Sequence, residues 1–151
     1  MSNIIEKFYT AFAEKDWETM QACYHDEVTF EDPAFGKLYG EEAKKMWRML
    51  CEQGKDLKIE FSKIEVSETS GKAHWEAWYT FSLTKRKIHN KIDAKFELKE
   101  GLILKHSDNF NLHKWASQAF GFKGWIFGGT NFFRKKFRAQ ARKSLKRYKA
   151  G

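Results

Sequence analysis

The sequence of 151 residues is poor in proline and cysteine, and it has no long hydrophobic run. A membrane-crossing helix needs about 18 or more consecutive apolar residues, and no such stretch occurs. The N-terminus, MSNIIEKFY, carries an early acid and lacks the apolar core of a secretory signal. Cys23 and Cys51 each lie among apolar residues in helix-like segments. We therefore predict reduced core cysteines in a single-domain cytoplasmic protein, without a disulfide.

Acidic residues are missing from the last part of the chain. Residues 131–151 hold nine Lys or Arg residues and no acid, whereas the other 130 residues hold 19 basic and 20 acidic residues. The net charge of +8 therefore belongs to a basic tail, and the preceding body is nearly neutral. Aromatic residues, in contrast, are abundant, and such side chains serve both hydrophobic cores and ligand pockets.

Alternation of apolar and polar residues from Gly71 to Leu112 predicts three consecutive antiparallel strands. The pattern covers residues 72–83, returns in residues 88–98, and returns again in residues 102–110. Turn-forming sequences separate the three runs. Such a meander is typical of a sheet with one buried face.

The turn at Gly101 predicts the register of the second hairpin. A three-residue loop ending at this glycine would pair Ala94 with His106 and Ile92 with Asp108. In that register His106, Asp108 and Asn90 share the face of the apolar row. A few polar groups on an apolar concave wall are typical of a ligand pocket.

The first 70 residues predict three helices and two further strands. Asn3 and Asp16 are expected to cap two helices, and a third helix should run from Glu41 to Gly54. A short strand should end at Pro33, and a longer strand over residues 57–67 changes phase near Lys63, as at a bulge. Helices followed by strands indicate an α+β fold with the helices on one face of the sheet.

Three motifs resemble the nuclear transport factor 2-like superfamily, in its SnoaL-like and ketosteroid isomerase-like branch. They are the helix pair FYTAFAEKDWETM, the strand end VTFEDP and the terminal stretch HSDNFNLHKWASQAFG. The resemblance implies a cone-shaped fold, in which a strongly bent antiparallel sheet of about 4–6 strands packs on three N-terminal helices. It covers residues 1–122, and residues 123–151 form an apolar patch and a basic amphipathic extension. Members of this superfamily include isomerases, cyclases, epoxide hydrolases and non-catalytic binding domains.

Asp108 is the strongest candidate for chemistry. Loss of hydration among apolar neighbours would make its carboxyl group a general acid or base, and the resemblance implies an acid/base aspartate near this strand end. His106 could orient Asp108 or touch a ligand, although a hydrogen-bonded core histidine is the simpler interpretation. Asp108 could also serve only to close the sheet. Asp32 is a second candidate carboxylate, but we favour a local role in which it accepts backbone hydrogen bonds.

The remaining pocket candidates are aromatic or border the polar residues. The predicted wall comprises Trp17, Tyr24, Asp32, Trp47, Trp75, Tyr79, Asn90, Ile92, Phe96 and Phe110. The sequence contains no HExxH or cysteine-rich metal motif, so we predict neither a required metal nor a cofactor.

The opposite face of the sheet carries a large aromatic residue among charged ones, which suits a homodimer interface. The predicted interface residues are His74, Glu76, Trp78 and His89. Alternatively, Trp78 lies beneath the tail.

The tail itself predicts a basic helix with one apolar stripe: Phe133, Phe137, Ala141, Leu145 and Tyr148. This helix could dock on the body, lie on an anionic membrane surface, or meet nucleic acid. Docking is favoured, and nucleic acid is the least supported of the three.

Two functions are consistent with this sequence. In the first, the protein is an enzyme that performs isomerisation, cyclisation or hydration of a small apolar molecule with Asp108 as general acid or base. In the second, it is a non-catalytic ligand-binding or interaction domain whose basic helix contacts a membrane or a partner. Fold resemblance alone does not choose between them.

Overall fold

The structure, a computed structural model, describes residues 3–149. In chain order its elements are α1 (Ile4–Ala13), α2 (Trp17–Cys23), β1 (Tyr24–Asp32), β2 (Gly36–Tyr39), α3 (Glu41–Gln53), β3 (Lys58–Val66), β4 (Ser70–Thr80), β5 (Lys87–Lys99), β6 (Leu102–Asn109), α4 (Leu112–Phe120), α5 (Phe122–Phe127) and α6 (Asn131–Arg147). The α+β class predicted from the sequence is confirmed.

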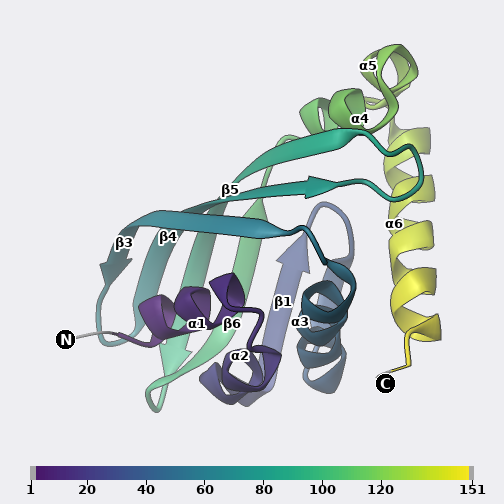
Figure 1. Cartoon of the computed structure of the whole chain (residues 1–151). Helices are drawn as coiled ribbons and strands as arrows, with labels where there is room; N and C mark the ends of the chain where they lie inside the picture. Colours follow the sequence, from purple (N-terminus) through teal and green to yellow (C-terminus); the bar gives the residue numbers. More distant parts are fainter. Residues whose placement is uncertain (1–2, 150–151) are drawn as a thin grey trace.

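A bent six-stranded sheet forms the frame, with the strand order β2-β1-β6-β5-β4-β3. Helices α1, α2 and α3 lie against its inner face, and α6 runs beside α3 at the β1–β2 end (Figure 1). The expectation of an entirely antiparallel sheet is wrong at one place, because β1 and β6 are parallel. The sequence does not reveal this pairing, since the two strands are far apart along the chain.

Local sequence signals set the helix starts and the bulge as predicted. Asn3 accepts a hydrogen bond from the backbone N–H of Glu6 at 2.8 Å, and Asp16 caps α2. In β3, Lys63 has a φ of 54°, and the pairing with β4 shifts register between Ser62 and Glu65. The change of phase in the sequence therefore corresponds to a real bulge.

The hairpin between β5 and β6 differs from its prediction. Glu100 and Gly101 both have positive φ, at 55° and 76°, so the loop has two residues rather than three. Ile103 is consequently buried at the tip, and one register shift follows between Leu98 and Glu97 before Phe96 pairs with His106. This pairing is displaced by two positions from the predicted one. Because side chains alternate with a period of two, His106 still faces inward as expected.

Two further strand boundaries differ from those predicted from the sequence. The glycine-bracketed segment after Pro33 was expected to be a loop, but it contains strand β2, which pairs with β1. Strand β4 ends at Thr80, earlier than predicted, because the next turn is tied to α4. There the Thr84 hydroxyl donates to the carbonyl of Ala119 at 2.6 Å, and Arg86 donates to the carbonyl of Gln118 at 2.7 Å.

Aromatic side chains dominate the core between α1, α3 and the sheet. Phe12 of α1 makes edge contacts with Trp47 of α3 and Trp75 of β4, with ring centroids 5.1 and 5.4 Å apart. Cys23 and Cys51 are buried free thiols, and burial raises the pKa of each to about 11. The aromatic abundance noted in the sequence therefore serves mainly the core.

Candidate functional site

A cavity of about 370 Å³ lies between the inner face of the sheet and helices α3, α4 and α6. Apolar side chains form most of its wall: Phe12, Phe30, Phe35, Met46, Trp47, Leu50, Trp75, Ile92, Phe110, Trp115, Phe137 and Ala141. Polar side chains also line it. Those on the strands are Asp32, Tyr79, Thr80, Asn90 and Asp108, and those outside the strands are Gln53, Asp56 and Ser82. A small apolar volume with a few polar groups is the usual form of a ligand site.

A chain of hydrogen bonds runs behind this wall and ends at Asp108. The indole N–H of Trp47 donates to the Tyr24 hydroxyl at 2.7 Å, and that hydroxyl lies 2.7 Å from His106 Nδ1. On its other side, His106 Nε2 lies 2.8 Å from Asp108 Oδ1, which also accepts the indole N–H of Trp75 at 3.3 Å. All five side chains are buried, so the orientation of Asp108 is fixed by groups that solvent does not reach.

The donors in this chain assign the histidine tautomer. An indole N–H only donates, so the Tyr24 oxygen accepts from Trp47 and its own hydrogen is free to point at His106 Nδ1. His106 then carries its hydrogen on Nε2 and donates it to Asp108. Burial and the nearby charge of Asp108 raise the pKa of Tyr24 well above its ordinary value, so the hydroxyl remains a neutral donor.

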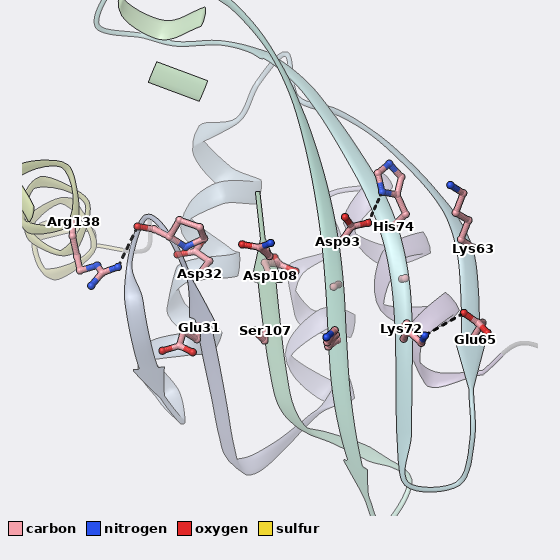
Figure 2. Close-up of a pocket in the computed structure, with 15 residues that line it drawn as sticks. Glu31, Asp32, Lys63, Glu65, Lys72, His74, Asp93, Ser107, Asp108 and Arg138 are labelled. Atoms are coloured by element: carbon pink, nitrogen blue, oxygen red, sulfur yellow. Dashed lines mark hydrogen bonds and ion pairs between the residues drawn. The ribbon is translucent and has the colours of Figure 1, made fainter. Parts of the chain in front are cut away.

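Asp32 lies beside Asp108 because of the parallel pairing of β1 with β6. The register pairs Phe30 with His106 and Glu31 with Ser107, so the next residues along the two strands are Asp32 and Asp108. Figure 2 shows the two aspartates on these neighbouring strands. Both line the cavity, which makes them a pair of carboxyl groups on one apolar wall.

The surroundings of Asp32 favour its protonated form. Burial raises the pKa of Asp32 to about 7; the backbone N–H of Phe35 opposes this shift, and the charge of Asp108 adds to it. The Phe35 N–H donates to Asp32 Oδ1 at 2.6 Å, so the local role expected from the sequence is present. The sequence did not indicate that the same side chain is also half-buried at the cavity, next to a second acid.

Helix α6 closes the cavity on the side of β1 and β2. Its residues Phe137 and Ala141 form part of the wall, and the Phe137 ring lies 4.5 Å from that of Trp115. Arg142 donates to the carbonyl oxygens of Phe35 and Lys37 at 2.6 and 2.7 Å. The favoured prediction for the tail, docking of its apolar stripe on the body, describes this arrangement.

The structure brings most of the predicted wall residues together at the cavity but leaves out four predicted site residues. Trp17 lies outside, where its ring stacks under the guanidinium of Arg48 at 3.8 Å. Tyr24 and His106 lie behind the wall in the hydrogen-bond chain, and the ring of Phe96 packs on His106 at 4.3 Å. Trp17 lies in α2, which contributes no residue to the cavity wall. Tyr24 and Phe96 both contact His106 behind the wall. His106 therefore contacts Asp108 and does not line the cavity.

Several wall residues were missed because they come from distant segments. Phe137 and Ala141 lie in the basic tail, and Trp115 lies in α4. The helical spacing of the apolar stripe in the tail was the signal for the first two. This spacing indicated that the apolar face of the tail would be buried, but it did not indicate which part of the protein would cover it.

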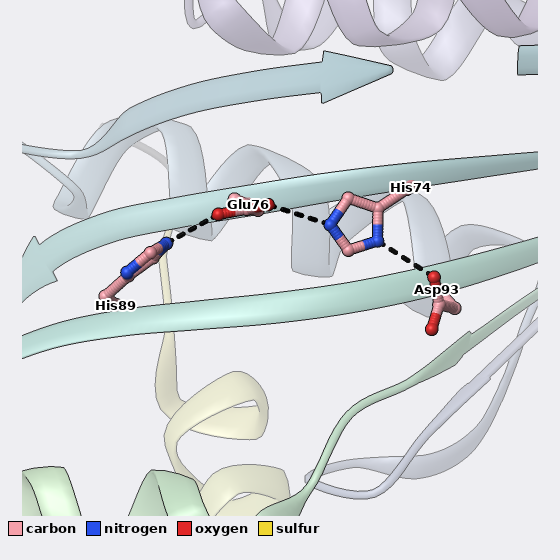
Figure 3. Close-up of polar contacts among 4 residues, drawn as sticks. All are labelled: His74, Glu76, His89 and Asp93. Atoms are coloured by element: carbon pink, nitrogen blue, oxygen red, sulfur yellow. Dashed lines mark hydrogen bonds and ion pairs between the residues drawn. The ribbon is translucent and has the colours of Figure 1, made fainter. Parts of the chain in front are cut away.

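The outer face of the sheet carries a separate polar network (Figure 3). Glu76 bridges two histidines, with Oε2 2.9 Å from His74 Nε2 and Oε1 2.6 Å from His89 Nε2. His74 Nδ1 lies 2.9 Å from Asp93 Oδ1, and the Trp78 ring stacks on His89 at 4.4 Å. Hydrogen bonds from both histidines lower the pKa of Glu76, and the bond to Asp93 raises the pKa of His74.

A wider hollow of about 780 Å³ crosses this outer face, next to the network. Side chains of both charges line it, including Lys63, Glu65, Lys72, Asp93 and Arg138 (Figure 2). Its wall is much more polar than that of the inner cavity. Among residues 3–149, no group of three or more His, Cys, Asp or Glu side chains is arranged to hold a metal ion.

The family model of the SnoaL-like domain matches residues 5–106 of this sequence. The chain belongs to the SnoaL-like family. The matched segment contains the inner network residues Tyr24, Trp47, Trp75 and His106, and it ends two residues before Asp108. The SnoaL-like match thus covers the frame that positions the carboxyl pair, while α4, α5 and α6 lie beyond it.

Solved structures with the same fold are distant in sequence. An LEH-like epoxide hydrolase from M. tuberculosis is 20% identical, with a TM-score of 0.61 over 83% of this chain and 88% of the other. A Catenulispora acidiphila protein with a ketosteroid isomerase-like fold, solved with trimethylamine, is 11% identical and has a TM-score of 0.67, over 77% and 91% of the two chains. The epoxide hydrolase/cyclase-like enzyme SalBIII is 15% identical, with a TM-score of 0.64 over 74% and 90%. No curated protein matches the SnoaL-like chain in sequence.

Proposed function

We propose that this SnoaL-like protein is an enzyme that transfers protons to and from a small, largely apolar molecule bound in the inner cavity. The observation that carries the proposal is the pair of neighbouring carboxyl groups, Asp32 and Asp108, on a mostly apolar wall. One acid is oriented by a buried hydrogen-bond chain, and the other keeps its proton to about neutral pH. Carboxyl groups whose environments differ in this way are suited to separate acid and base roles.

In the proposed chemistry, Asp108 is the base and Asp32 is the acid. The carboxylate of Asp108 removes a proton from a carbon or from a water molecule next to the substrate. Asp32 gives its proton to the substrate oxygen on which negative charge develops. In epoxide opening, the proton that Asp108 takes from water then passes through solvent to Asp32, which restores the starting state. In isomerisation, Asp108 returns its proton to a second carbon and Asp32 takes its proton back from the enol oxygen. His106, Tyr24 and Trp75 hold Asp108 in place and act only through it.

The fold neighbours support this class of reaction without naming a substrate. Two of them are described as an epoxide hydrolase and an epoxide hydrolase/cyclase-like enzyme. Opening an epoxide requires a base to activate water and an acid to protonate the leaving oxygen, which are the two roles proposed here. Apolar epoxides are therefore the first substrates to test, followed by apolar unsaturated ketones for isomerisation.

The test compares turnover by the native chain and by Asp108→Asn, with Asp93→Asn as the matched control on the outer face. We expect Asp108→Asn to lower kcat by about 10²–10⁴-fold, because removal of a general base has that effect. The asparagine still accepts the hydrogen bonds from His106 and Trp75, so folding and ligand affinity should remain. Equal turnover in the native and Asp108→Asn proteins, on a substrate that both bind, would rule out the catalytic role.

A second candidate function is ligand binding without turnover. Both carboxyl groups also have structural partners, since Asp32 accepts from Phe35 and Asp108 accepts from His106 and Trp75. In that case apolar compounds would bind in the cavity and shift the amide signals of its lining residues in NMR spectra. No member of the substrate panel would be consumed, and Asp108→Asn would leave affinity unchanged.

Assembly as a homodimer through the outer face belongs to the same proposal. Trp78 and His89 stack there, and Lys58 lies 5.6 Å from the Trp78 ring. A Trp78→Glu variant should convert the dimer to a monomer in size-exclusion chromatography with light scattering. A native chain that is monomeric at all concentrations would contradict this assembly.

A further inference from the structure

Five large apolar side chains lie exposed at the end of the molecule where α5 meets α6. Phe122, Trp125, Ile126 and Phe127 of α5 and Phe132 of α6 are between 45% and 75% exposed. Only three other large apolar residues among residues 3–149 are similarly exposed, and they are scattered. Exposed apolar side chains that gather at one place mark an interaction surface. We call these five residues the aromatic patch.

Two glycines explain why α5 turns this patch outward. Gly124 in α5 and Gly128 at its C-cap lie four residues apart, on the side that contacts α4. A Cβ atom at Gly124 would lie 1.9 Å from the carbonyl oxygen of Ala116, and one at Gly128 would lie 2.6 Å from the Ala116 side chain. The helix therefore buries its glycine face against α4, and its aromatic side chains project into solvent. These aromatic side chains therefore contribute little to the hydrophobic core.

The segment that carries the aromatic patch is strongly basic. Residues 109–151 contain eleven Lys or Arg residues and no Asp or Glu. Among the described residues of this segment, no basic side chain forms an ion pair. Lys136 Nζ lies 5.7 Å from the Phe132 ring, so positive charge and aromatic surface are in direct contact. This end of the molecule is complementary to a surface that is apolar inside and negatively charged outside.

A basic hollow of about 380 Å³ lies beside the patch. Its lining includes Arg134, Arg138 and His113 together with the backbone around Gly128. The Nε atom of Arg138 is buried and has no hydrogen-bond partner among residues 3–149. Guanidinium groups in such a hollow suit a phosphate group at the depth of lipid headgroups.

We propose that the α5–α6 end is a docking surface for an anionic phospholipid bilayer. The aromatic patch enters the interfacial region, and the exposed lysines and arginines meet the charged headgroups. Helix α6 does not insert its own apolar stripe, because Phe137, Ala141 and Leu145 already pack against the body. No helix among the described residues is long and apolar enough to cross a membrane. The proposal concerns attachment to the surface, and it does not depend on the chemistry proposed for the cavity.

Co-sedimentation with vesicles tests the proposal on the full chain. The vesicles consist of phosphatidylcholine alone or of phosphatidylcholine mixed with phosphatidylglycerol. We expect binding to the anionic vesicles, weaker binding at raised ionic strength, and little binding to the neutral vesicles. The double variant Trp125→Ser/Phe127→Ser and the double variant Arg134→Gln/Lys135→Gln should each weaken binding by about tenfold or more.

Matched controls separate this surface from general effects of charge and hydrophobicity. Tyr39→Ser/Val66→Ser removes exposed apolar side chains elsewhere, and Lys91→Gln/Lys95→Gln removes charges from the outer face of the sheet. Both controls should bind anionic vesicles as the native chain does. Since all the substituted side chains are exposed, circular dichroism and thermal unfolding should show that every variant folds.

Three results would overturn the proposal. The first is the absence of binding to either kind of vesicle. The second is a dimer that Trp125→Ser/Phe127→Ser converts to a monomer, without vesicle binding, which would identify a second copy as the occupant. The third is tight binding of a labelled oligonucleotide without vesicle binding, which would assign the basic face to nucleic acid.

Discussion

Two clusters of acids and histidines lie on opposite faces of the same sheet, and one acid in each has a pKa that is shifted, in opposite directions. In the inner cluster, which comprises Asp32, Asp108, His106 and Tyr24, burial raises the pKa of Asp32 to about 7. In the outer cluster, which comprises His74, Glu76, His89 and Asp93, hydrogen bonds lower the pKa of Glu76. The residue types and the bond lengths are similar in both clusters. The two clusters differ in how far water reaches their carboxyl groups.

This contrast indicates why only the inner cluster is a good candidate for chemistry. In water, a carboxylate beside a histidine remains ionised and contributes little energy. On an apolar wall, burial raises the pKa of the same group. It is then still protonated near neutral pH and can donate that proton to a substrate. The outer cluster is better suited to a wet interface, where histidine–carboxylate contacts set specificity more than affinity.

The largest stability effect is expected from Asp32→Asn. The folded carboxyl keeps a proton that the unfolded chain releases above about pH 4, so native stability falls as pH rises from about 4 to about 7. The asparagine retains the acceptor for the Phe35 N–H and has no such titration. We expect the variant to exceed the native chain in stability at alkaline pH, by on the order of 4 kcal/mol. Urea unfolding across this pH range measures the difference.

A constant stability difference between the two proteins from pH 4 to pH 9 would show that Asp32 is not shifted by burial. The expected result is a difference that grows with pH and levels off above the folded pKa. Activity provides an independent check, because the same deprotonation would remove the acid and produce a falling rate above about pH 7.

The next largest effect is expected from Tyr24→Phe. Without the hydroxyl, the Trp47 indole N–H and His106 Nδ1 both lose their partner inside the core. Each buried group left unsatisfied costs about 1–3 kcal/mol, so the variant should lose at least that much unfolding free energy. Asp108 should also become less well oriented, which would lower kcat more than it raises KM.

Tyr9→Phe is the matched control for this substitution. The Tyr9 hydroxyl is buried and has no hydrogen-bond partner among residues 3–149. Its removal should be neutral or slightly stabilising, because no bond is lost and a desolvated polar group disappears. Equal destabilisation by Tyr9→Phe and Tyr24→Phe would mean that the hydrogen-bond chain contributes nothing beyond packing.

The smallest effect is expected on the outer face, from Glu76→Gln, and it should have the opposite pH dependence. Because the folded pKa of Glu76 is lowered, its contribution is complete above the unfolded pKa and is lost as pH falls through the folded value. The variant should therefore be slightly less stable than the native chain at neutral pH, and the gap should close on acidification. A gap that widens toward alkaline pH, as for Asp32→Asn, would erase the distinction between the two clusters.

The sequence predicted the elements and the faces of the strands better than it predicted the site. Period-two alternation predicted that His106 and Asp108 face inward, and they do. The predicted hairpin register was wrong by two positions, but a shift of two residues keeps each side chain on the same face of the sheet. The caps at Asn3 and Asp16 and the bulge at Lys63 were also readable, since each depends only on neighbouring residues.

The carboxyl pair was not predictable from the sequence, because it depends on contacts between distant segments. Asp32 and Asp108 become neighbours only through the parallel pairing of β1 with β6, a pairing that no periodicity encodes. The closing wall at Phe137 and Ala141 depends likewise on where the tail docks. A single sequence reveals which faces are apolar, but it does not reveal which apolar faces meet.

The most direct measurement is a carboxyl-carbon NMR titration of the native chain, with Asp32→Asn and Asp108→Asn for assignment. We predict one aspartate signal with a midpoint near 7 that disappears in Asp32→Asn. Replacement of the neighbouring charge in Asp108→Asn should move that midpoint downward, because the carboxylate of Asp108 helps to keep Asp32 protonated. If all aspartate signals titrate near the ordinary aspartate pKa of about 3.9 or below, the cavity contains no shifted acid and the proposed acid–base pair is contradicted.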